Sequence, residues 1–579
     1  MIIAAPLASA ASFSSESSVG AGTLAPGGVA ALNNNLNDGT WTAISTPQQL
    51  ALIGNSPMYP LNGKYYLAND IVFTSEDDTN GGIGIAVSVT VSGTSLTVTL
   101  TPPSGSITSL SAWMGASYAK STSNSVTLSN IPQGVHTLVI SGAAGPNLFA
   151  HSMRIDTVGN GMKVNNAIFS SNGNFTPIGP VNQPYYEANP NTLFTGAFDG
   201  NGHVISGLHI AVCNANGDSY AGLFGVVSGA TITNLGLVGG SVTASTPDPN
   251  GSANAGGVAG MAVAAAVSAT ISNCYNTGIV AASTLGGIGS AAGISCLVTA
   301  TEKGVQSVAQ CYNTGPVAAM GAPGSYGAYA GGIVCGAVTF TEAYADVSDC
   351  YNTGPVYASG PPNSYLLCAG GIVGVAGRYM DATSGSLMTI SNCYNSGPVA
   401  VSTNGSPQGM LVGGISGVTE SSTRSTVITN CYFLQGMLQK NGVTVADVLY
   451  GGGLATVDGN SSGMQGSGAQ WSGAKSATEM RPALSAAQSG NSVYCTGVTL
   501  VNQQVVQGWD FYNTWAIDPG ANNGYPVLAS SSAGGSPDQP GGGDNGLFGG
   551  NETVVIASVA AVVVAIIVSA VLLLVLRKP

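Results

Sequence analysis

Apolar residues along this chain fall in short runs and not in a helical pattern. Runs such as Ala269-Thr270-Ile271 and Met388-Thr389-Ile390 are bounded by Asn, Gly and Pro. Short runs rich in β-branched residues between turn-forming residues are typical of β-strands. Each Gly inside a helix would cost about 1 kcal/mol, and this chain has 84 glycines. The pattern therefore predicts an all-β protein.

One string of residues recurs along the middle of the chain. Cys-Tyr-Asn-Thr-Gly begins at Cys274, Cys311 and Cys350, carries Ser in place of Thr from Cys393, and decays to Cys-Tyr-Phe from Cys431. These cysteines are separated by 37, 39, 43 and 38 residues. A near-constant period of this size is typical of a solenoid, in which each unit buries its apolar face by stacking on the next.

A glycine pair recurs with the same period. It begins at Gly331, Gly370 and Gly413, each time 20 residues after the preceding Cys of the motif. Each repeat therefore divides into two halves, and a half of this length suits one coil of a parallel β-helix with a rise of roughly 4.8 Å per coil. The sequence predicts two coils per repeat around ladders of Val, Ile, Ala and Cys. The alternative is an array of β-sandwiches, which would require antiparallel hairpins.

The corner residues have predicted roles in this β-helix. The glycine pairs are expected at corners, with positive φ or close backbone approach. The motif Asn is expected to adopt a left-handed conformation or to bond its own backbone two residues on.

The two recurring motifs together carry a resemblance. Gly-Gly-Ile from Gly331 or Gly370, with Cys-Tyr-Asn-Thr-Gly, resembles the GLUG-type repeat of prokaryotic cell-surface proteins. The lead-in Phe194–His203, the opening segment from Trp41 to Ile71 and the closing segment from Trp509 to Leu528 are also similar to that family. The resemblance implies a right-handed β-helix in an adhesin-like protein, and it implies no catalytic residues.

An inserted segment interrupts the opening of the predicted β-helix. From about Gly82 to Ala150 the chain alternates apolar and polar residues, as in Ile85–Val91 and Ser95–Leu100. This alternation with regular turns predicts a small Ig-like β-sandwich. The flanking segments Asp70–Phe73 and Met153–Asp156 are expected to be strands of the β-helix. The insertion is interpreted as a spacer, with a ligand-presenting module as the alternative.

The C-terminal residues predict a membrane anchor. Thr553 to Leu576 is an uncharged run dominated by Val, Ala, Ile and Leu, followed by Arg577-Lys578-Pro579. As a helix it would extend roughly 35 Å, enough to cross a bilayer core. The basic residues after the run favour a cytoplasmic tail and an extracellular β-helix. A buried core helix is the alternative. At the other end, residues 1–11 resemble the last part of a secretory signal cleaved after Ala10, with a disordered leader as the alternative.

These observations predict ten consecutive segments. They are a truncated signal peptide (1–11), a linker (12–40), the opening segment (41–81), the inserted sandwich (82–150), the first coils (151–255), the GLUG-type repeats (256–436), the closing coils and cap (437–529), a flexible Gly/Ser/Pro linker (530–551), a transmembrane helix (552–576) and a cytoplasmic tail (577–579).

The cysteines of the motif are expected to be buried free thiols. With two coils per repeat, successive motif cysteines would lie roughly 9 to 10 Å apart. Cα atoms more than about 7 Å apart cannot be joined by a disulfide without distortion. A structural ladder of small apolar thiols is therefore predicted at Cys274, Cys311, Cys350, Cys393 and Cys431. No Cys-x2-Cys pair indicates zinc, and no cofactor is predicted.

Composition and spacing point to surface contact and not to catalysis. Only 6% of residues are charged, and the net charge of −13 with 12 basic residues argues against nucleic acid. No acidic residue recurs with the period of the motif, so stacking does not build a carboxylate cluster. The variable segments carry the candidate contact residues Tyr326, Tyr329, Tyr357 and Tyr365, which could bind a glycan or a surface protein of another cell. The alternatives are a spacer without ligand and a polysaccharide-active enzyme.

Overall fold

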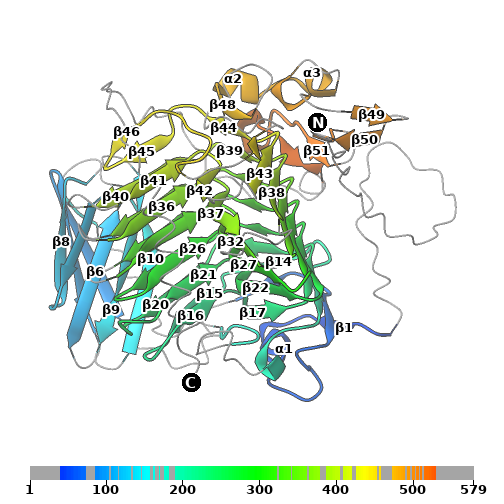
Figure 1. The fold of residues 1–579 in the computed structure, drawn as a ribbon. Helices are drawn as coiled ribbons and strands as arrows, with labels where there is room; N and C mark the ends of the chain where they lie inside the picture. The colour runs from blue at the N-terminus through cyan, green and yellow to red at the C-terminus, as the bar shows by residue number, and fades with distance from the viewer. Residues whose placement is uncertain are drawn as a thin grey trace, which may run out of the picture.

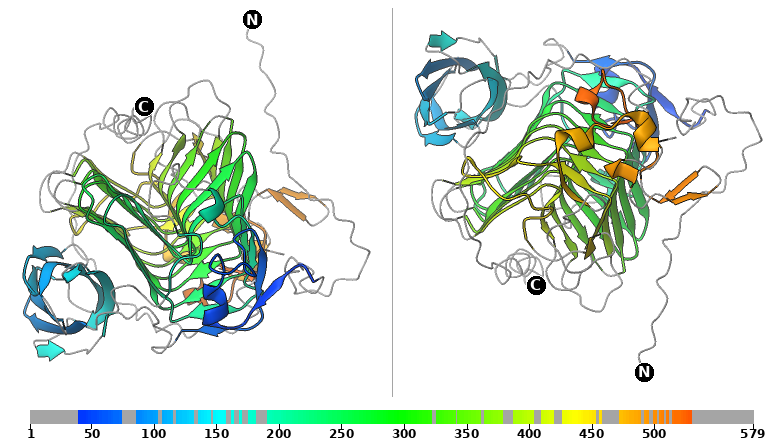
Figure 2. Two further views of the ribbon diagram at one scale, coloured as in Figure 1. Left: turned by 90° about the horizontal axis from the view of Figure 1, so that it is seen from below. Right: turned by 90° about the horizontal axis from the view of Figure 1, so that it is seen from above.

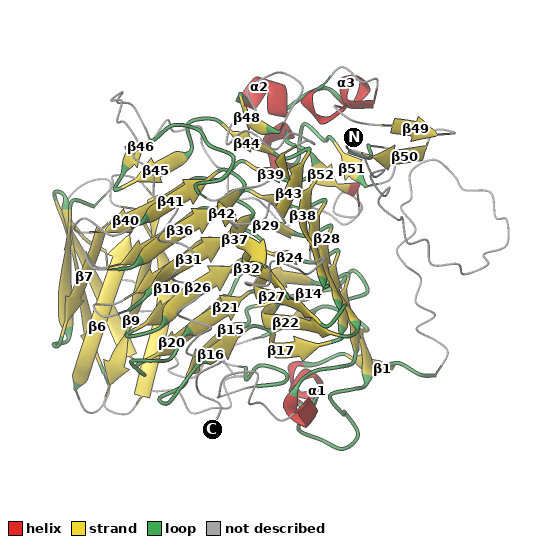
Figure 3. Ribbon diagram, in the orientation of Figure 1, coloured by secondary structure: helices red, strands yellow, loops and turns green. Residues whose placement is uncertain are grey.

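The computed structural model describes residues 39–529, apart from internal segments of which the longest are 74–84, 181–189, 379–386 and 458–471. Almost all of the regular structure is β-strand (Figure 3). The chain winds around a common axis, and equivalent strands of successive coils form five parallel sheets that run along this axis. A separate antiparallel module lies beside them (Figure 1). The parallel β-helix predicted from the repeats is confirmed, and the array of antiparallel sandwiches is excluded.

One repeat forms one coil, so the prediction of two coils per repeat was wrong. The Cys-Tyr motifs of successive repeats pair directly, with Tyr275 beside Tyr312 and Tyr312 beside Tyr351. The glycine pairs do the same, with Gly331 beside Gly370. Both recurring motifs are bends of the same coil, on opposite sides of its interior. The two halves of a repeat are therefore two sides of one large coil of five strands.

We number the five sheets in the order in which the chain passes through them within a coil. The first sheet contains β1 (Thr42–Ile44), β2 (Lys64–Leu67), β13 (Ala197–Asp199), β18 (Thr231–Thr233), β23 (Ser268–Ser272), β28 (Val305–Ala309), β33 (Tyr344–Ser348), β38 (Leu387–Ser391), β43 (Thr426–Thr429) and β47 (Thr456–Val457). The second contains β3 (Ile71–Val72), β14 (Val204–Ser206), β19 (Gly236–Val238), β24 (Tyr275–Asn276), β29 (Tyr312–Asn313), β34 (Tyr351–Asn352), β39 (Tyr394–Asn395), β44 (Tyr432–Leu434) and β48 (Gly473–Lys475).

The other three sheets complete each coil. The third contains β15 (His209–Cys213), β20 (Ser241–Thr246), β25 (Ile279–Thr284), β30 (Val317–Gly321), β35 (Val356–Gly360), β40 (Val399–Thr403), β45 (Leu438–Lys440) and the antiparallel β46 (Val443–Thr444). The fourth contains β16 (Ser219–Ala221), β21 (Ala253–Gly256), β26 (Ile288–Ala292), β31 (Gly327–Gly331), β36 (Leu366–Gly370) and β41 (Met410–Gly413). The fifth contains β17 (Phe224–Ser228), β22 (Ala259–Ala265), β27 (Ser295–Thr301), β32 (Val334–Thr339), β37 (Val373–Arg378) and β42 (Ser416–Thr419).

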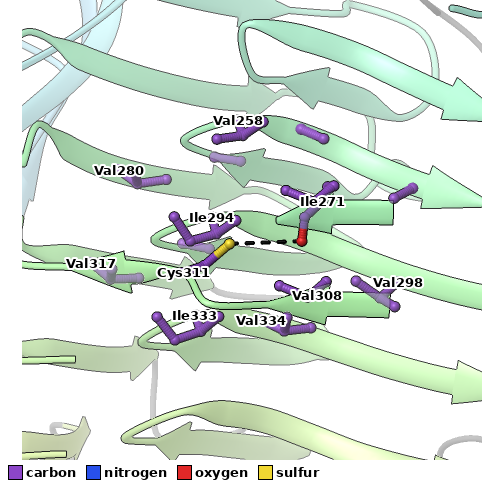
Figure 4. Packing of buried hydrophobic residues seen from close by; sticks show 14 of the residues in the cluster. Val258, Ile271, Val280, Ile294, Val298, Val308, Cys311, Val317, Ile333 and Val334 are labelled. Carbon is purple, nitrogen blue, oxygen red and sulfur yellow. Dashed lines mark hydrogen bonds between the residues drawn. The ribbon is translucent and has the colours of Figure 1, made fainter. Parts of the chain in front are cut away.

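The interior of the coils consists of stacked Val, Ile, Ala and Cys side chains, as predicted. Around Cys311, the side chains of Val308 from β28 and of Ile294 and Ile333 from bends of successive coils pack in one cluster (Figure 4). Cys311 is fully buried, and its thiol lies 3.2 Å from the carbonyl oxygen of Ala309. Each inward residue repeats the one below it because the parallel strands pair in register.

A column of asparagines explains why the two motifs recur together. The buried motif residues Asn276, Asn313, Asn352 and Asn395 form a chain in which each Nδ2 donates to the next Oδ1, at 3.0, 2.9 and 2.8 Å. Each Nδ2 also donates to the backbone two residues on, as in Asn276 to Gly278 at 2.8 Å. The predicted bond from the motif Asn to the backbone two residues on is confirmed. The predicted left-handed conformation is not found, because none of these four asparagines has a positive φ.

The glycine pair leaves room for this asparagine column. A Cβ on Gly332 would lie 2.6 Å from Cγ of Asn352 and 2.0 Å from the carbonyl oxygen of Gly371. Gly371 has the same relation to Asn395. The glycines thus serve close approach, and the left-handed conformation occurs instead at the residue before each motif Cys, such as Asn273 with φ of 52°.

The inserted segment forms two antiparallel sheets around a core of its own, and Figure 2 shows these sheets curved around a common interior. Their strands are β4 (Ile85–Ser92), β5 (Ser95–Thr101), β6 (Ile107–Met114), β7 (Ser117–Ser121), β8 (Ser125–Ser129), β9 (Val135–Ala144), β10 (Asn147–Asp156), β11 (Gly161–Lys163) and β12 (Ile168–Phe169). Buried Val89, Leu96, Leu128 and Ile140 belong to this separate core.

Two details of the predicted insertion were wrong. It does not end at Ala150, because β10 pairs with β9 and β12 pairs with β4. Met153–Asp156 therefore belongs to the insertion and not to the β-helix. The Ig-like label is not supported, since what the strands show is two antiparallel sheets with the orders β10-β9-β6-β7 and β11-β4-β5-β8. Ile71–Val72, in contrast, is a β-helix strand as predicted.

Short helices lie near both ends of the described chain. Helix α1 (Pro47–Ala51) follows β1, and Thr46 caps it by accepting the backbone N–H of Gln49. Near the other end lie α2 (Ala477–Met480), α3 (Leu484–Gln488), β49 (Thr499–Val501), β50 (Gln504–Gln507), β51 (Trp515–Ala516) and β52 (Val527–Leu528), with 3-10 turns at Val493–Cys495 and Asn522–Gly524. A further 3-10 turn at Pro190–Thr192 precedes β13. We call the elements from α2 to β52 the cap.

The predicted transmembrane helix at 552–576 lies outside the described residues, as do the predicted signal peptide, most of the 12–40 linker and the 530–551 linker. Within the described part of the chain, no helix has the length and apolar character needed to cross a membrane.

Candidate functional site

The third and fourth sheets pack face to face and form a flattened arm of the β-helix (Figure 2). Small buried residues, such as Ala282 and Ala319 from the third sheet and Ala291 and Ala330 from the fourth, lie between them. Because alanine side chains are short, the two sheets approach closely. The bend from the third to the fourth sheet is the tip of this arm. It holds Tyr326 and Tyr365, two of the candidate contact residues predicted from the sequence.

A row of apolar and aromatic side chains lies at the tip. Leu285 and Tyr326 are 41% and 44% exposed, and Tyr365 is partly exposed. The backbone N–H of Tyr326 donates to Gly286 and Gly287 of the coil below, and that of Tyr365 donates to the carbonyl of Tyr326 at 3.0 Å. The three residues therefore occupy three consecutive coils. We call Leu285, Tyr326 and Tyr365 the tip row.

Tyr329 adjoins the tip row, whereas Tyr357 does not. Ala328 and Ala330 point into the core, so Tyr329 lies on the outer face of the fourth sheet, where it packs with Tyr365 beside Leu366 and Cys368. Burial raises the pKa of Tyr329 well above its usual value. Tyr357 lies on the outer face of the third sheet, since Val356 and Ala358 face the core. Burial raises its pKa to about 12.

The five motif cysteines are fully buried free thiols, but the spacing argument for them was wrong. Cys274, Cys311, Cys350, Cys393 and Cys431 occupy neighbouring coils. In-register parallel strands lie roughly 4.8 Å apart, a separation that does not by itself exclude a disulfide. Each thiol instead lies close to backbone carbonyls, such as that of Cys274 at 3.2 Å from the carbonyl oxygen of Ser272. Burial raises the pKa of Cys274 and Cys311, which makes them poor nucleophiles.

The motif tyrosines form a stack on the outer face of the second sheet. Ring centroids of Tyr275 and Tyr312, and of Tyr312 and Tyr351, lie 4.7 Å apart, and those of Tyr351 and Tyr394 lie 5.1 Å apart. The cap covers the last members of this stack, Tyr351, Tyr394 and Tyr432, which belong to one cluster with Trp509 and Trp515. Tyr275 and Tyr312 remain partly exposed.

Two acidic side chains lie close to the corner between the first and second sheets, and Asp349 of this pair bonds the cap. Asp346 accepts hydrogen bonds from the hydroxyls of Ser348 and Thr389, and Trp515 Nε1 donates to Asp349 Oδ1 at 3.2 Å. Burial raises the pKa of both carboxyl groups, that of Asp349 to about 7. Both carboxylates are held by protein donors, so nothing in this arrangement leaves them directed at a substrate.

The described metal-ligating and histidine side chains have structural roles. Within the described part of the chain, no group of three or more His, Cys, Asp and Glu could hold a metal ion. His203 Nδ1 lies 3.0 Å from Asp70 Oδ1 at the opening end of the second sheet. The same Asp70 oxygen accepts the backbone N–H of Val204 at 3.1 Å, which is a structural role.

Sequence reasoning missed three features of these surfaces. It did not single out Leu285, because a leucine carries no functional signal without its exposure. It did not use the Tyr of the repeated motif, although a tyrosine at a fixed position in every repeat predicts a stack in any solenoid. It also passed over Asp349, which stands where neighbouring repeats have Asn or Gln.

Comparison with known proteins adds little to this picture. No protein-family model matches the chain, and no curated protein sequence is similar to it. A putative immunoglobulin A1 protease from Bacteroides ovatus is 20% identical with a TM-score of 0.35, over 60% of this chain and 81% of that one. Pectate lyase Pel3 from Pectobacterium carotovorum is 9% identical with a TM-score of 0.12, over 62% and 88%. Similarities this low carry no argument about fold or activity.

Proposed function

We propose that this chain is a membrane-anchored cell-surface protein whose rigid β-helix presents the tip row for contact with another surface. The observation that carries the proposal is the exposure of Leu285 and Tyr326, with Tyr365 beside them, at a single edge of the rod. Large apolar side chains exposed together on a soluble surface are a typical sign of an interaction site.

The surroundings of the tip row support contact and not catalysis. The arm behind it consists of two packed sheets that continue into the other three sheets of the β-helix, so the row is presented on a rigid support. Tyrosine offers a large, stiff and amphipathic contact area at low entropic cost. The ligand that fits this surface is a neutral glycan or an apolar protein patch, because only 6% of residues in the chain are charged.

The membrane anchor and the export of the β-helix rest on the sequence alone. The apolar run from Thr553 to Leu576 with the basic residues behind it supports a single C-terminal span with the β-helix outside. The GLUG-type resemblance and the signal-like N-terminus agree with this topology. A spacer without ligand is the second candidate. It is favoured by the Ser and Thr side chains at the outward positions of strands of the inserted module such as β5.

Binding to a glycan array and to whole cells tests the proposal. The soluble ectodomain should bind, and the double variant Tyr326→Ala and Tyr365→Ala should lose at least tenfold in affinity because it removes two of the three contact side chains. Tyr66→Ala is the matched control, since Tyr66 lies partly exposed on β2, far along the chain from the tip row. An ectodomain that binds nothing, or a double variant that binds like the control, would favour the spacer.

A further inference from the structure

We infer that Asp349 and Trp515 form a proton-sensitive clasp that holds the cap on the β-helix more tightly in acid than at neutral pH. The clasp joins two segments 166 residues apart through one hydrogen bond, from Trp515 Nε1 to Asp349 Oδ1. It lies beside the aromatic cluster with which the cap covers the tyrosine stack.

The position of Asp349 within the coils gives the first step of the argument. It belongs to a column of corner residues with left-handed backbone, whose other members are Asn234, Asn273, Gln310, Asn392 and Asn430. Every other member of this column carries an amide. Asn273 Nδ2 donates to Asn234 Oδ1 at 2.7 Å, and Asn430 Nδ2 donates to Asn392 Oδ1 at 3.2 Å. In these two pairs the amide of one coil donates to the amide of the coil before it.

A carboxylate cannot take the donating role that the amides have in these pairs, whereas a carboxylic acid can. Ionised Asp349 can only accept, from Asn392 and from Trp515. Protonated Asp349 gains the O–H donor that an amide at this corner would supply. The neutral form therefore matches the column better than the charged form does.

The charges around Asp349 act in the same direction. Burial under the cap disfavours the carboxylate, and Asp346 from β33 and Asp510 from the cap add repulsion. The hydrogen bonds from Trp515 and Asn392 oppose these effects without cancelling them, and the pKa is raised to about 7. Lys475 of β48 and Arg481 of the cap lie over the rings of Tyr432 and Tyr525, respectively.

The sign of the pH dependence follows from linkage. A carboxyl group whose pKa is higher in the docked state than in the exposed state stabilises docking below its exposed pKa of about 4. That contribution is lost as the pH rises from about 4 through about 7, because docking then requires proton uptake. One linked proton changes the docking equilibrium by at most tenfold per pH unit.

Hydrogen exchange of the full chain between pH 4 and 8, corrected for intrinsic exchange rates, tests the clasp. The protection of peptides from residues 509–529 should fall up to tenfold per pH unit between about pH 4 and 7. Asp349→Asn restores the amide of the other coils and should make the profile flat. Asp518→Asn, the same substitution at a cap residue that only caps the turn to Gly520, should keep the wild-type profile.

A second variant keeps the test decisive if Asp349→Asn does not fold. Trp515→Phe retains an aromatic ring but removes the indole N–H that donates to the Asp349 carboxylate. Without this donor the carboxylate is less favoured, so the midpoint of the profile should move to higher pH. A purely structural role of Trp515 would lower protection at every pH without moving the midpoint. A flat wild-type profile, or an Asp349→Asn profile with the wild-type slope, would overturn the inference.

Discussion

The β-helix and the inserted module are both all-β, yet they bury their cores in opposite ways. In the β-helix, residues stack on their equivalents in the next coil, so the interior holds columns of one residue type, such as the asparagine column from Asn276 to Asn395. In the module, antiparallel strands alternate inward Val and Leu with outward Ser and Thr around a closed core. A substitution in a column therefore disturbs the packing of the neighbouring coils, whereas a substitution in the module core disturbs only the module.

The largest expected effect tests the asparagine column at a glycine that faces it. Gly371→Ala would place a Cβ 2.1 Å from the carbonyl oxygen of Gly414 and 2.5 Å from Cγ of Asn395. Because backbone on the next coil cannot move independently, we expect a loss of more than about 4 kcal/mol in the free energy of unfolding, or no folded protein. Urea unfolding measures it. Gly520→Ala, where the nearest atom is a side-chain oxygen at 3.3 Å, is the control and should change little.

Leu128→Ala tests the module in the same way. Leu128 is fully buried in the module core, and its truncation should cost about 3 kcal/mol. The loss should appear as increased hydrogen exchange and proteolysis within residues 85–169, with the protection of the β-helix unchanged. Equal loss of protection in both regions would show that their cores are not independent.

Asn352→Ala tests whether the amide column itself contributes to stability. The variant removes the acceptor of Asn313 and the donors to Asn395 and to the carbonyl of Gly354. Buried partners left without hydrogen bonds should cost about 2 kcal/mol. Thermal unfolding of this variant beside Asn55→Ala, an exposed asparagine near α1, provides the measurement. A difference below about 0.5 kcal/mol between the two would contradict a stabilising column.

Excision of the module should have the smallest effect. The chain leaves the β-helix near Phe73 and returns near Phe175, whose ring centroids are 5.6 Å apart, so a short linker can replace the residues between them. The free energy of unfolding of the β-helix, obtained from its urea midpoint, should change by less than about 1 kcal/mol, because the module has a core of its own. Insoluble protein after excision would show that the β-helix needs the module.

The candidate contact residues show where prediction from sequence ends. The variable segments identified Tyr326, Tyr329 and Tyr365 as neighbours in function, and the structure brings these three together at one edge of the arm. Tyr357 came from the same reasoning, but it lies on the outer face of the third sheet, whereas Tyr329 lies on the outer face of the fourth sheet, on the other side of the arm. Which sheet of the arm carries a residue follows from the bends of the coil, and the sequence did not predict these bends.

The sequence by itself determined the parallel β-helix, its apolar ladders and the presence of an antiparallel module. It did so because in-register stacking requires the same residue types at a fixed period. Only the tertiary structure decided the number of coils per repeat, since a bend and a coil boundary use the same Gly and Asn residues. It also decided which tyrosines the cap covers and that Asp349 meets Trp515, because these contacts join segments whose separation follows no period.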